Sequence, residues 1–138
     1  MEYVPVPYIK SISLNTGSSV TIKGKANMPF IMSPEMQVDF LTGTEEKSDI
    51  ALSFRVYFGN CVVMNSRQCG DWESEEKYSC MPFVDSQPFA LHISVLQNEY
   101  QIMVNGRQCY TFPHRLRPES VQTFQVWRDV FLNSVSVS

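Results

Sequence analysis

Long hydrophobic runs and runs of basic residues are missing from this chain of 138 residues, and we expect no signal peptide in its first residues. No apolar run approaches the roughly 18 residues that a membrane-spanning helix needs, so membrane insertion is not expected. Lys and Arg are scattered and the net charge is −3, which offers no electrostatic surface to nucleic acid. Pro5 and Pro7 interrupt the N-terminal segment before the apolar region of a signal peptide could form. We therefore expect a cytoplasmic protein that, if it acts outside the cell, leaves by another route.

Cysteine and histidine are also sparse. The four cysteines are Cys61, Cys69, Cys80 and Cys109. Their wide spacing lacks the close pairs of a zinc site, and a cytosolic chain of this size needs no disulfide framework, so we interpret them as reduced thiols. The only histidines, His92 and His114, exclude a His-rich metal site, and neither belongs to a recognisable nucleophile motif. We predict no metal, no cofactor and no catalytic residue; a Cys–His hydrolase is the weakest alternative, since sequence distance does not forbid contact in space.

Helical periodicity is the third missing feature, and alternation of apolar and polar residues takes its place. Strands are expected over residues 8–14, 19–25, 36–40, 50–58, 89–95, 100–104, 107–112, 121–127 and 129–137. Turn-forming residues separate them, and Asn105-Gly106 is the strongest hairpin signal. About ten short strands without a helical period predict an all-β sandwich of two antiparallel sheets. No linker or repeat divides the chain, so we expect one domain over residues 1–138.

The strand expected over residues 50–58 has the most regular alternation. One face carries Ile50, Leu52, Phe54, Val56 and Phe58, and the other carries Ala51, Ser53, Arg55 and Tyr57. Strict alternation means that one face packs on a core while the opposite face meets solvent. The second face is therefore the one that we expect a ligand to reach.

Residues suited to a sugar site begin on that face and continue beyond it. They are Ser53, Arg55, Tyr57, Asn65, Trp72, Glu75 and Lys77. The apolar face of a pyranose stacks on an aromatic ring, here Trp72, while fixed polar groups read the hydroxyls. Glu75 and Lys77 are two positions apart, so on a strand they share a face. The alternatives are that Trp72 is a half-buried packing residue, that Asn65 caps a turn, and that the charged residues form a solvated ion-pair network.

Motifs along nearly the whole chain occur in the order found in one family. They are Val4-Pro5-Val6-Pro7-Tyr8, Met36-Gln37-Val38-Asp39-Phe40, Ser48-Asp49-Ile50-Ala51, Val62-Val63-Met64-Asn65-Ser66-Arg67, Trp72, Met81-Pro82-Phe83, Asn98-Glu99-Tyr100, Val104-Asn105-Gly106, Phe112-Pro113-His114-Arg115 and Gln125-Val126-Trp127-Arg128-Asp129. With these motifs the chain resembles the galectins, most closely the Charcot–Leyden crystal and placental branch. The resemblance implies a jelly-roll sandwich with a groove for galactoside-type glycans on its concave sheet.

The family's sugar motif is His-x-Asn-x-Arg, then Val-x-Asn, then Trp-x-x-Glu-x-Arg. Val63-Met64-Asn65 and Trp72-Glu73-Ser74-Glu75 match it, with Lys77 in place of the final Arg. The first block departs from it completely: Ser53, Arg55 and Tyr57 stand where His, Asn and Arg are expected. Losing two charged hydrogen bonds, each of about 1.5–3 kcal/mol, lowers affinity by about two to four decades. We therefore predict weak or redirected glycan binding, with Arg55 compensating through Glu75 or a sugar hydroxyl.

The resemblance leaves a second function open, in which the chain keeps the fold, abandons sugars and acts through protein interaction or self-assembly. The resemblance implies glycans and glycoproteins as partners of the chain, and a homodimer as its oligomeric state. The cytoplasm and the nucleus are the locations it implies, with secretion that needs no signal peptide. Trp127 is interpreted as a core or dimer contact, and His114-Arg115 as a motif of the fold rather than of the site.

Overall fold

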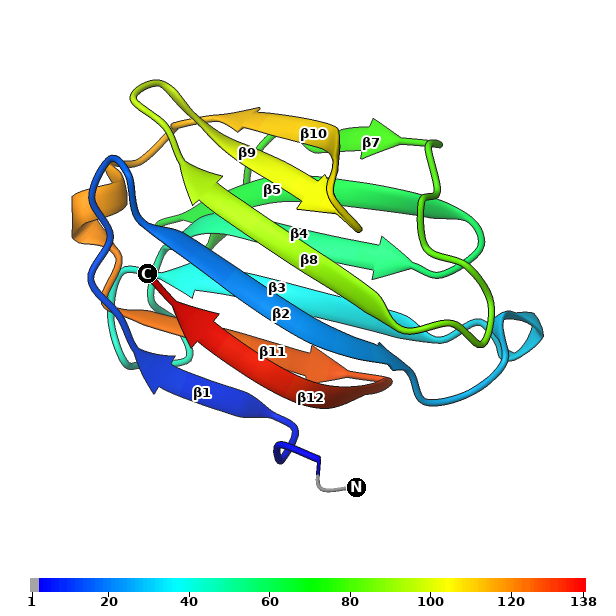
Figure 1. Ribbon diagram of the computed structural model, residues 1–138. Coiled ribbons are helices and arrows are strands. Elements are labelled where there is room, and N and C mark those ends of the chain that lie inside the picture. Colours follow the sequence, from blue (N-terminus) through cyan, green and yellow to red (C-terminus); the bar gives the residue numbers. More distant parts are fainter. Residues whose placement is uncertain (1–2) are drawn as a thin grey trace.

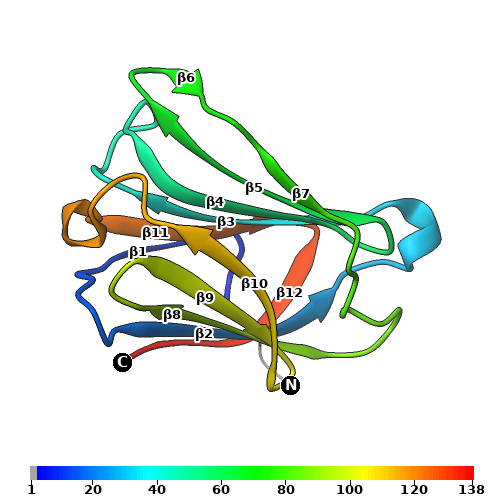
Figure 2. The same cartoon turned by 90° about the horizontal axis from the view of Figure 1, so that it is seen from above.

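Two antiparallel sheets, one of seven strands and one of five, lie face to face in the computed structural model, which describes residues 3–138 (Figures 1 and 2). The arrangement confirms the expected all-β sandwich, and its only helical segments among these residues are short 3₁₀ turns. None of the helices in residues 3–138 is long and apolar enough to cross a bilayer. Predictions for Met1 and Glu2 lie outside the described residues.

Each sheet has a simple strand order. The seven-stranded sheet runs β1 (Tyr8–Ser11), β11 (Thr123–Arg128), β3 (Glu35–Leu41), β4 (Ile50–Tyr57), β5 (Cys61–Gln68) and β6 (Asp71–Trp72), with β7 (Glu76–Tyr78) also paired to β5. The five-stranded sheet runs β10 (Arg107–Pro113), β9 (Glu99–Val104), β8 (Phe89–Val95), β2 (Ser19–Ala26) and β12 (Val130–Val137). The 3₁₀ turns are η1 (Phe30–Met32) and η2 (Pro118–Ser120).

The core fills the space between the sheets with the apolar side chains that alternation directs inward. Phe40 and Phe124 from the seven-stranded sheet lie edge to face, with ring centroids 6.3 Å apart. Phe40 also meets Tyr100 of β9 across the core at 5.5 Å, a distance typical of favourable aromatic pairs. The inward side chains form the core between the sheets. The side chains that alternate with them point to the outer face of each sheet, where polar residues can lie.

The predicted alternation in β4 is wrong at its first two residues. The pairing of β4 with β5 is irregular between Ile50 and Ser53. A bulge, which adds one residue to one of two paired strands, gives an irregularity of this kind. Ala51 and Leu52 are both part of the core, whereas Ile50, assigned to the core by its sequence position, lines the outer groove beside Trp72. From Ser53 onward the alternation holds, so the predicted outward residues of this strand face the same side.

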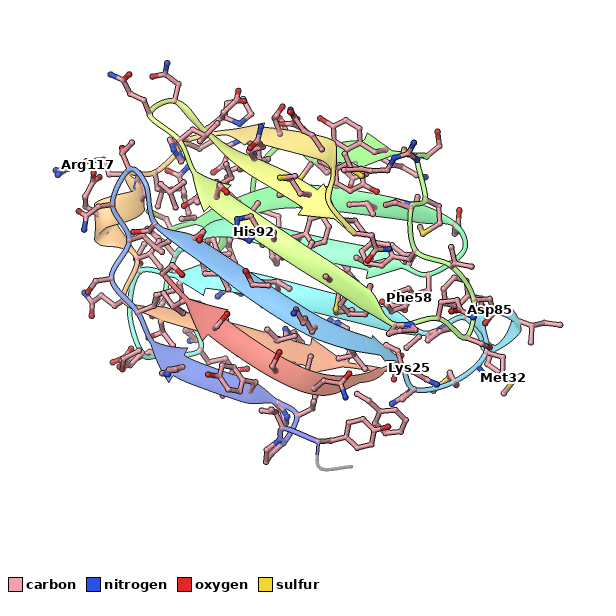
Figure 3. The ribbon with its side chains drawn as sticks, in the orientation of Figure 1. Lys25, Met32, Phe58, Asp85, His92 and Arg117 are labelled. Atoms are coloured by element: carbon pink, nitrogen blue, oxygen red, sulfur yellow. The ribbon has the colours of Figure 1, made fainter. Side chains whose placement is uncertain are left out.

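Turns at one end of the sandwich follow local chemistry. Asn105 and Gly106 both have positive φ, 52° and 81°, so the expected Asn-Gly hairpin between β9 and β10 is confirmed. At the same end of the sandwich Phe30 of η1 stacks on Phe58 at 5.2 Å, and its backbone N–H donates to Asp85. Figure 3 shows Phe58, Asp85 and Met32 gathered at that end, and His92 on the five-stranded sheet far from them. The strand expected over residues 8–14 is shorter, because β1 ends at Ser11.

Candidate functional site

The outer face of the seven-stranded sheet is hollowed, and β6 rises away from the rest of the sandwich at one side (Figure 2). A cavity of about 300 Å³ lies over β4, β5 and β6, lined by Gln37, Ser53, Arg55, Tyr57, Val63, Asn65, Trp72 and Glu75. We call it the β4–β5 groove. A second cavity of about 620 Å³ continues over β3, β11 and β1, and we call it the β3–β11 groove. Gln37, Arg55 and Trp72 line both, so the two form one continuous surface.

All the residues predicted for the sugar site except Lys77 line the β4–β5 groove. Trp72 is 50% exposed, so a large part of its ring is available for contact with a ligand. Arg67 lies over the Trp72 ring at 5.6 Å and donates to the backbone carbonyls of Glu46 and Ser48. Arg67 thereby joins the Trp72 ring to the loop before β4.

Asn65 is fixed by hydrogen bonds on every side. Its Nδ2 donates to the carbonyl of Glu73 at 3.0 Å, and its Oδ1 accepts from the Ser66 backbone at 2.8 Å. Arg115 Nη1 also donates to this Oδ1, at 3.1 Å. The interpretation of Asn65 as a simple turn cap is too narrow, because its side chain joins β5 to the segment that carries Glu75.

Arg115 connects Asn65 of the β4–β5 groove to the segment that contains Ser74 and Glu76. Its Nη2 donates to the carbonyl of Ser74 at 2.7 Å and lies 3.3 Å from Glu76 Oε2, while its guanidinium covers the Phe112 ring at 4.6 Å. Glu76 in turn accepts from the Tyr78 hydroxyl at 3.1 Å, and burial, then this hydrogen bond, raise the pKa of Tyr78. The sequence analysis interpreted Arg115 as a residue that supports the fold. The structure adds a direct hydrogen bond from Arg115 to Asn65, which lines the β4–β5 groove.

Arg55 is paired with a residue that the sequence analysis did not connect to it. Its Nε donates to Glu35 Oε1 at 2.9 Å, and Nη2 contacts the same oxygen. The proposed pairing with Glu75 is absent from the ion pairs of residues 3–138. The Arg55 guanidinium also lies over the Tyr57 ring, 4.9 Å from its centroid. Glu35 and Tyr57 therefore set the position of Arg55 at the boundary of the two grooves.

A buried polar network underlies the place where the grooves meet. Gln37 Nε2 donates to Asp39 Oδ1 at 3.0 Å and to Ser53 Oγ at 3.3 Å. Asp39, which is 1% exposed, also accepts from Gln125 Nε2 at 2.8 Å and from Trp127 Nε1 at 3.0 Å. Buried carboxylates need such donors, so β3 and β11 are joined through one carboxyl group, and β4 is added through Gln37.

Trp127 belongs to this outer face rather than to the core. Its indole N–H bonds to Asp39, its ring lines the β3–β11 groove, and the Arg128 guanidinium covers the ring at 4.0 Å. Of the two interpretations of Trp127, the core contact is therefore wrong, and the dimer contact stays a prediction. Lys77, by contrast, is exposed on β7 opposite Val63 and lines neither groove.

Several groove residues went unpredicted because their role depends on strands that are distant in sequence. These are Gln37, Asp39, Gln125 and Arg128. A signal was present in Met36-Gln37-Val38-Asp39-Phe40 and in Gln125-Val126-Trp127, where polar residues alternate with core residues. That alternation shows which face of the sheet Gln37 and Asp39 occupy. It does not show that β11 pairs with β3 and brings Gln125 and Trp127 into contact with Asp39.

Comparison with known proteins gives one consistent family. The model of galactoside-binding lectins matches residues 5–137. Human galectin-16 is 48% identical over 138 residues, with 100% of this chain and 97% of the relative covered. Human galactoside-binding soluble lectin 13 is 50% identical over 137 residues, with 99% of each covered. A solved structure of a human galectin-16 variant is 47% identical with a TM-score of 0.94, covering 100% of this chain and 99% of that one. Sheep galectin-11 in complex with glycerol is 41% identical with a TM-score of 0.92, covering 98% and 99%.

Proposed function

Because this chain belongs to the galactoside-binding lectin family, we propose that it binds a glycan in the β4–β5 groove with an altered preference. One observation carries the proposal: Trp72, half exposed, shares a single groove with Asn65 and Glu75. An accessible ring beside fixed polar groups suits the stacking and hydroxyl recognition that a pyranose needs. Residues 1–138 act in this proposal as one carbohydrate-recognition domain.

The altered preference follows from the residues at the base of the groove. Ser53 and Tyr57 supply neutral hydroxyls where the family motif has cationic or imidazole groups, and Ser53 already accepts from Gln37. Arg55 is the one guanidinium in the replaced block, and Glu35 and Tyr57 direct it. A neutral hydrogen bond contributes roughly half of what a charge-assisted one does. Affinity for lactose is therefore expected to lie near the millimolar end of useful binding, about −4 kcal/mol.

The role of Arg55 distinguishes weak binding from redirected binding. Its Nε and Nη2 are occupied by Glu35, while Nη1 has no hydrogen bond among residues 3–138. A guanidinium held in place loses little further entropy when it meets a ligand oxygen. We propose that this Nη1 edge contacts a sugar hydroxyl, so that Arg55 serves the groove and does not block it.

The test is an NMR titration of the two indole N–H signals, since the chain has only Trp72 and Trp127. Lactose, then a panel of other sugars, should shift Trp72, and the Trp72→Ala variant should lose binding on a glycan array. Ile31→Ala, which removes an 88%-exposed apolar side chain on η1, is the control and should bind as the native chain does. Array binding that survives Trp72→Ala unchanged would refute this site.

Self-assembly is a second candidate, favoured by the two edge strands, of which β12 has one isolated bridge on its outer side, between Leu132 and Val4. β1 and β12 lie at the same side of the sandwich (Figure 1) and end their sheets. Ile9 on β1 is 63% exposed, and Tyr3 and Phe131 stack at 4.9 Å with 48% and 40% exposure. Exposed edges with apolar side chains are sites of chain pairing. A homodimeric mass in light scattering that becomes monomeric with Ile9→Lys supports a dimer at this edge; a monomer at high concentration counts against it.

The proposed locations are the cytoplasm and the nucleus, with export that needs no signal peptide. All four cysteines are free, and Cys69 and Cys80 are exposed, a state that suits a reducing compartment. Cell fractionation of a tagged chain tests the assignment, and recovery only from the medium would contradict it. Glycoproteins are the partners expected at the groove under either location.

A further inference from the structure

The two sheets meet at one edge of the sandwich, where β7 faces β10. β10 ends the five-stranded sheet, β7 pairs with β5 of the other sheet, and the two strands lie side by side in Figure 1. Tyr78 of β7 and Tyr110 of β10 have ring centroids 5.4 Å apart. A cavity of about 320 Å³ lies there, lined by Tyr78 and by residues 108–111. We call this region, together with Cys80, the β7–β10 junction.

Two of the four free cysteines belong to the junction. Cys80 is exposed and lies just after β7, and its carbonyl accepts a hydrogen bond from the Tyr110 hydroxyl at 2.7 Å. Cys109 is the neighbour of Tyr110 in β10 and lines the cavity. Tyr110 therefore connects the backbone of one cysteine to the strand that contains the other.

A bulge in β10 sets the side of the strand on which the Cys109 thiol lies. The pairing with β9 is irregular between Gln108 and Tyr110, so Cys109 is the additional residue of the bulge. Gln108 lies on the outer face, where it accepts from Gln101 at 2.9 Å, whereas Tyr110 is buried. Cys109 is half-buried and packs against the core. The thiol thus lies on the same side of β10 as the Tyr110 side chain, which reaches Cys80.

The thiols of Cys80 and Cys109 are near enough in space for the charge of one to affect the other. Burial is the largest cause that raises the pKa of Cys109, and the negative charge of a Cys80 thiolate raises it further. Burial, then the charges of these two thiolates, also raise the pKa of Tyr110. Such repulsion falls with distance. A disulfide between the two sulfur atoms would remove it, because neither sulfur then carries a charge.

We propose that Cys80 and Cys109 are a site of oxidative modification, at which glutathione disulfide converts the two thiols into one internal disulfide. The exposed Cys80 thiolate attacks a sulfur of glutathione disulfide, forms a mixed disulfide and releases one glutathione thiolate. The Cys109 thiolate then attacks the Cys80 sulfur and releases the second. The two cysteines give up two electrons and two protons, and glutathione disulfide takes up both as it becomes two glutathione molecules.

The compartment sets the state of this pair. The cytosolic glutathione pool keeps thiols reduced, whereas an extracellular protein meets oxidising conditions. The disulfide would connect the segment after β7 to β10 and so link the edges of the two sheets. Closing a loop in the unfolded chain stabilises the folded one, and we expect the midpoint of thermal unfolding to rise by about 5–10 °C.

The experiment treats the reduced native chain with glutathione disulfide and maps its peptides without reduction. The mass should fall by two hydrogen atoms, and one cross-linked pair of peptides should contain Cys80 and Cys109. The oxidised chain should melt at the higher temperature, and dithiothreitol should reverse both changes. Cys69→Ser removes an exposed thiol outside the junction, so it is the matched control and should form the same disulfide.

Cys80→Ser and Cys109→Ser should each abolish the internal disulfide and the rise in melting temperature. Cys109→Ser should also accumulate a glutathione adduct at Cys80, since no second thiol resolves it. If either variant does not fold, the peptide map of the native chain gives the pairing by itself.

A disulfide between other cysteines, or a native chain that collects only glutathione adducts, would overturn the proposal. So would loss of the disulfide in Cys69→Ser, because Cys69 would then take part. The readouts are covalent bonds and melting temperature, and no glycan enters the experiment. Its outcome is therefore independent of the proposed lectin function.

Discussion

The outer faces of the two sheets differ in how they hold polar side chains. In residues 3–138 every buried polar or charged residue lies in a strand of the seven-stranded sheet: Gln37, Asp39, Ser53, Asn65, Ser66 and Thr123. On the five-stranded sheet the outward polar residues are partly or fully exposed. Thr21 and His92 form a local pair there, with Oγ1 and Nδ1 2.7 Å apart. Hydrogen bonds hold five of the six in two clusters, one around Asp39 and one around Asn65, and Thr123 Oγ1 has no partner among residues 3–138; the outer face of the other sheet is a solvated surface.

The difference shows where the sequence supports a site. Buried polar groups are stable only when their partners are in place, so the seven-stranded face is ordered before any ligand arrives. Preorganised groups lose less entropy on binding than mobile surface side chains do. An alternating strand pattern occurs on both sheets, and only the network of hydrogen bonds separates a candidate binding face from an ordinary one.

Asp39→Ala should have the largest effect, because it breaks the network at its centre. Removal of the carboxyl leaves the buried donor of Gln37 and the part-buried donors of Gln125 and Trp127 without their acceptor. We expect a loss of about 3 kcal/mol in the free energy of unfolding, measured by urea denaturation.

Thr21→Ala is the matched control on the other sheet. It removes one part-buried hydrogen bond to His92 and should cost about 1 kcal/mol. Equal losses in the two variants would contradict the contrast between the faces.

Arg115→Lys should have the next largest effect, about 2 kcal/mol, because lysine cannot reproduce several guanidinium contacts at once. Arg115 contacts Asn65, Ser74 and Glu76. Glycan affinity should fall as well, and the Asn65 side-chain amide signals should shift in the unliganded protein. A stability loss with unchanged Asn65 signals and unchanged affinity would show that Arg115 supports only the fold.

Tyr100→Phe should stabilise the protein slightly, by about 0.5–1 kcal/mol. The Tyr100 hydroxyl on β9 is buried and has no hydrogen-bond partner among residues 3–138. Chemical denaturation at neutral pH measures the change. A destabilised variant would indicate that the hydroxyl has a partner.

The same variant predicts a change with pH. Burial raises the pKa of Tyr100 above its ordinary value of 10.0, so the native state keeps the proton that the unfolded chain releases. The resulting stability is complete below pH 10 and is lost as the pH rises through the raised pKa. Tyr100→Phe should therefore lose stability less steeply in alkaline solution than the native chain does.

The smallest expected difference between the two sheets is in the reactivity of their cysteine thiols. Cys69 is exposed after β5, while burial raises the pKa of Cys109 on β10. Because the thiolate is the reactive form, iodoacetamide should label Cys69 before Cys109, and the rate at Cys109 should rise with pH. Buried Cys61 should be labelled last. Peptide mass spectrometry gives the order, and faster labelling of Cys109 than of Cys69 would contradict it.

The sequence by itself determined the two-sheet sandwich, most strand positions and six of the eight residues that line the β4–β5 groove. Alternation is a local property with a period of two, so it places Ser53, Arg55 and Tyr57 on one face without knowledge of the rest of the fold. Sequence motifs, read through the family resemblance, supplied Asn65, Trp72 and Glu75. Lys77 lines neither groove, so its place in the site stays a prediction.

Only the tertiary structure decided how these residues are held and what lies beside them. Glu35 pairs with Arg55, and the partners of Asp39 lie 86 and 88 residues away in β11. The bulge at Ile50 and the positive φ of Arg128 each reverse a face that alternation predicts. Strand pairing brings together segments that are far apart in the chain, and a bulge or a left-handed residue arises from that packing; neither is encoded in a local period.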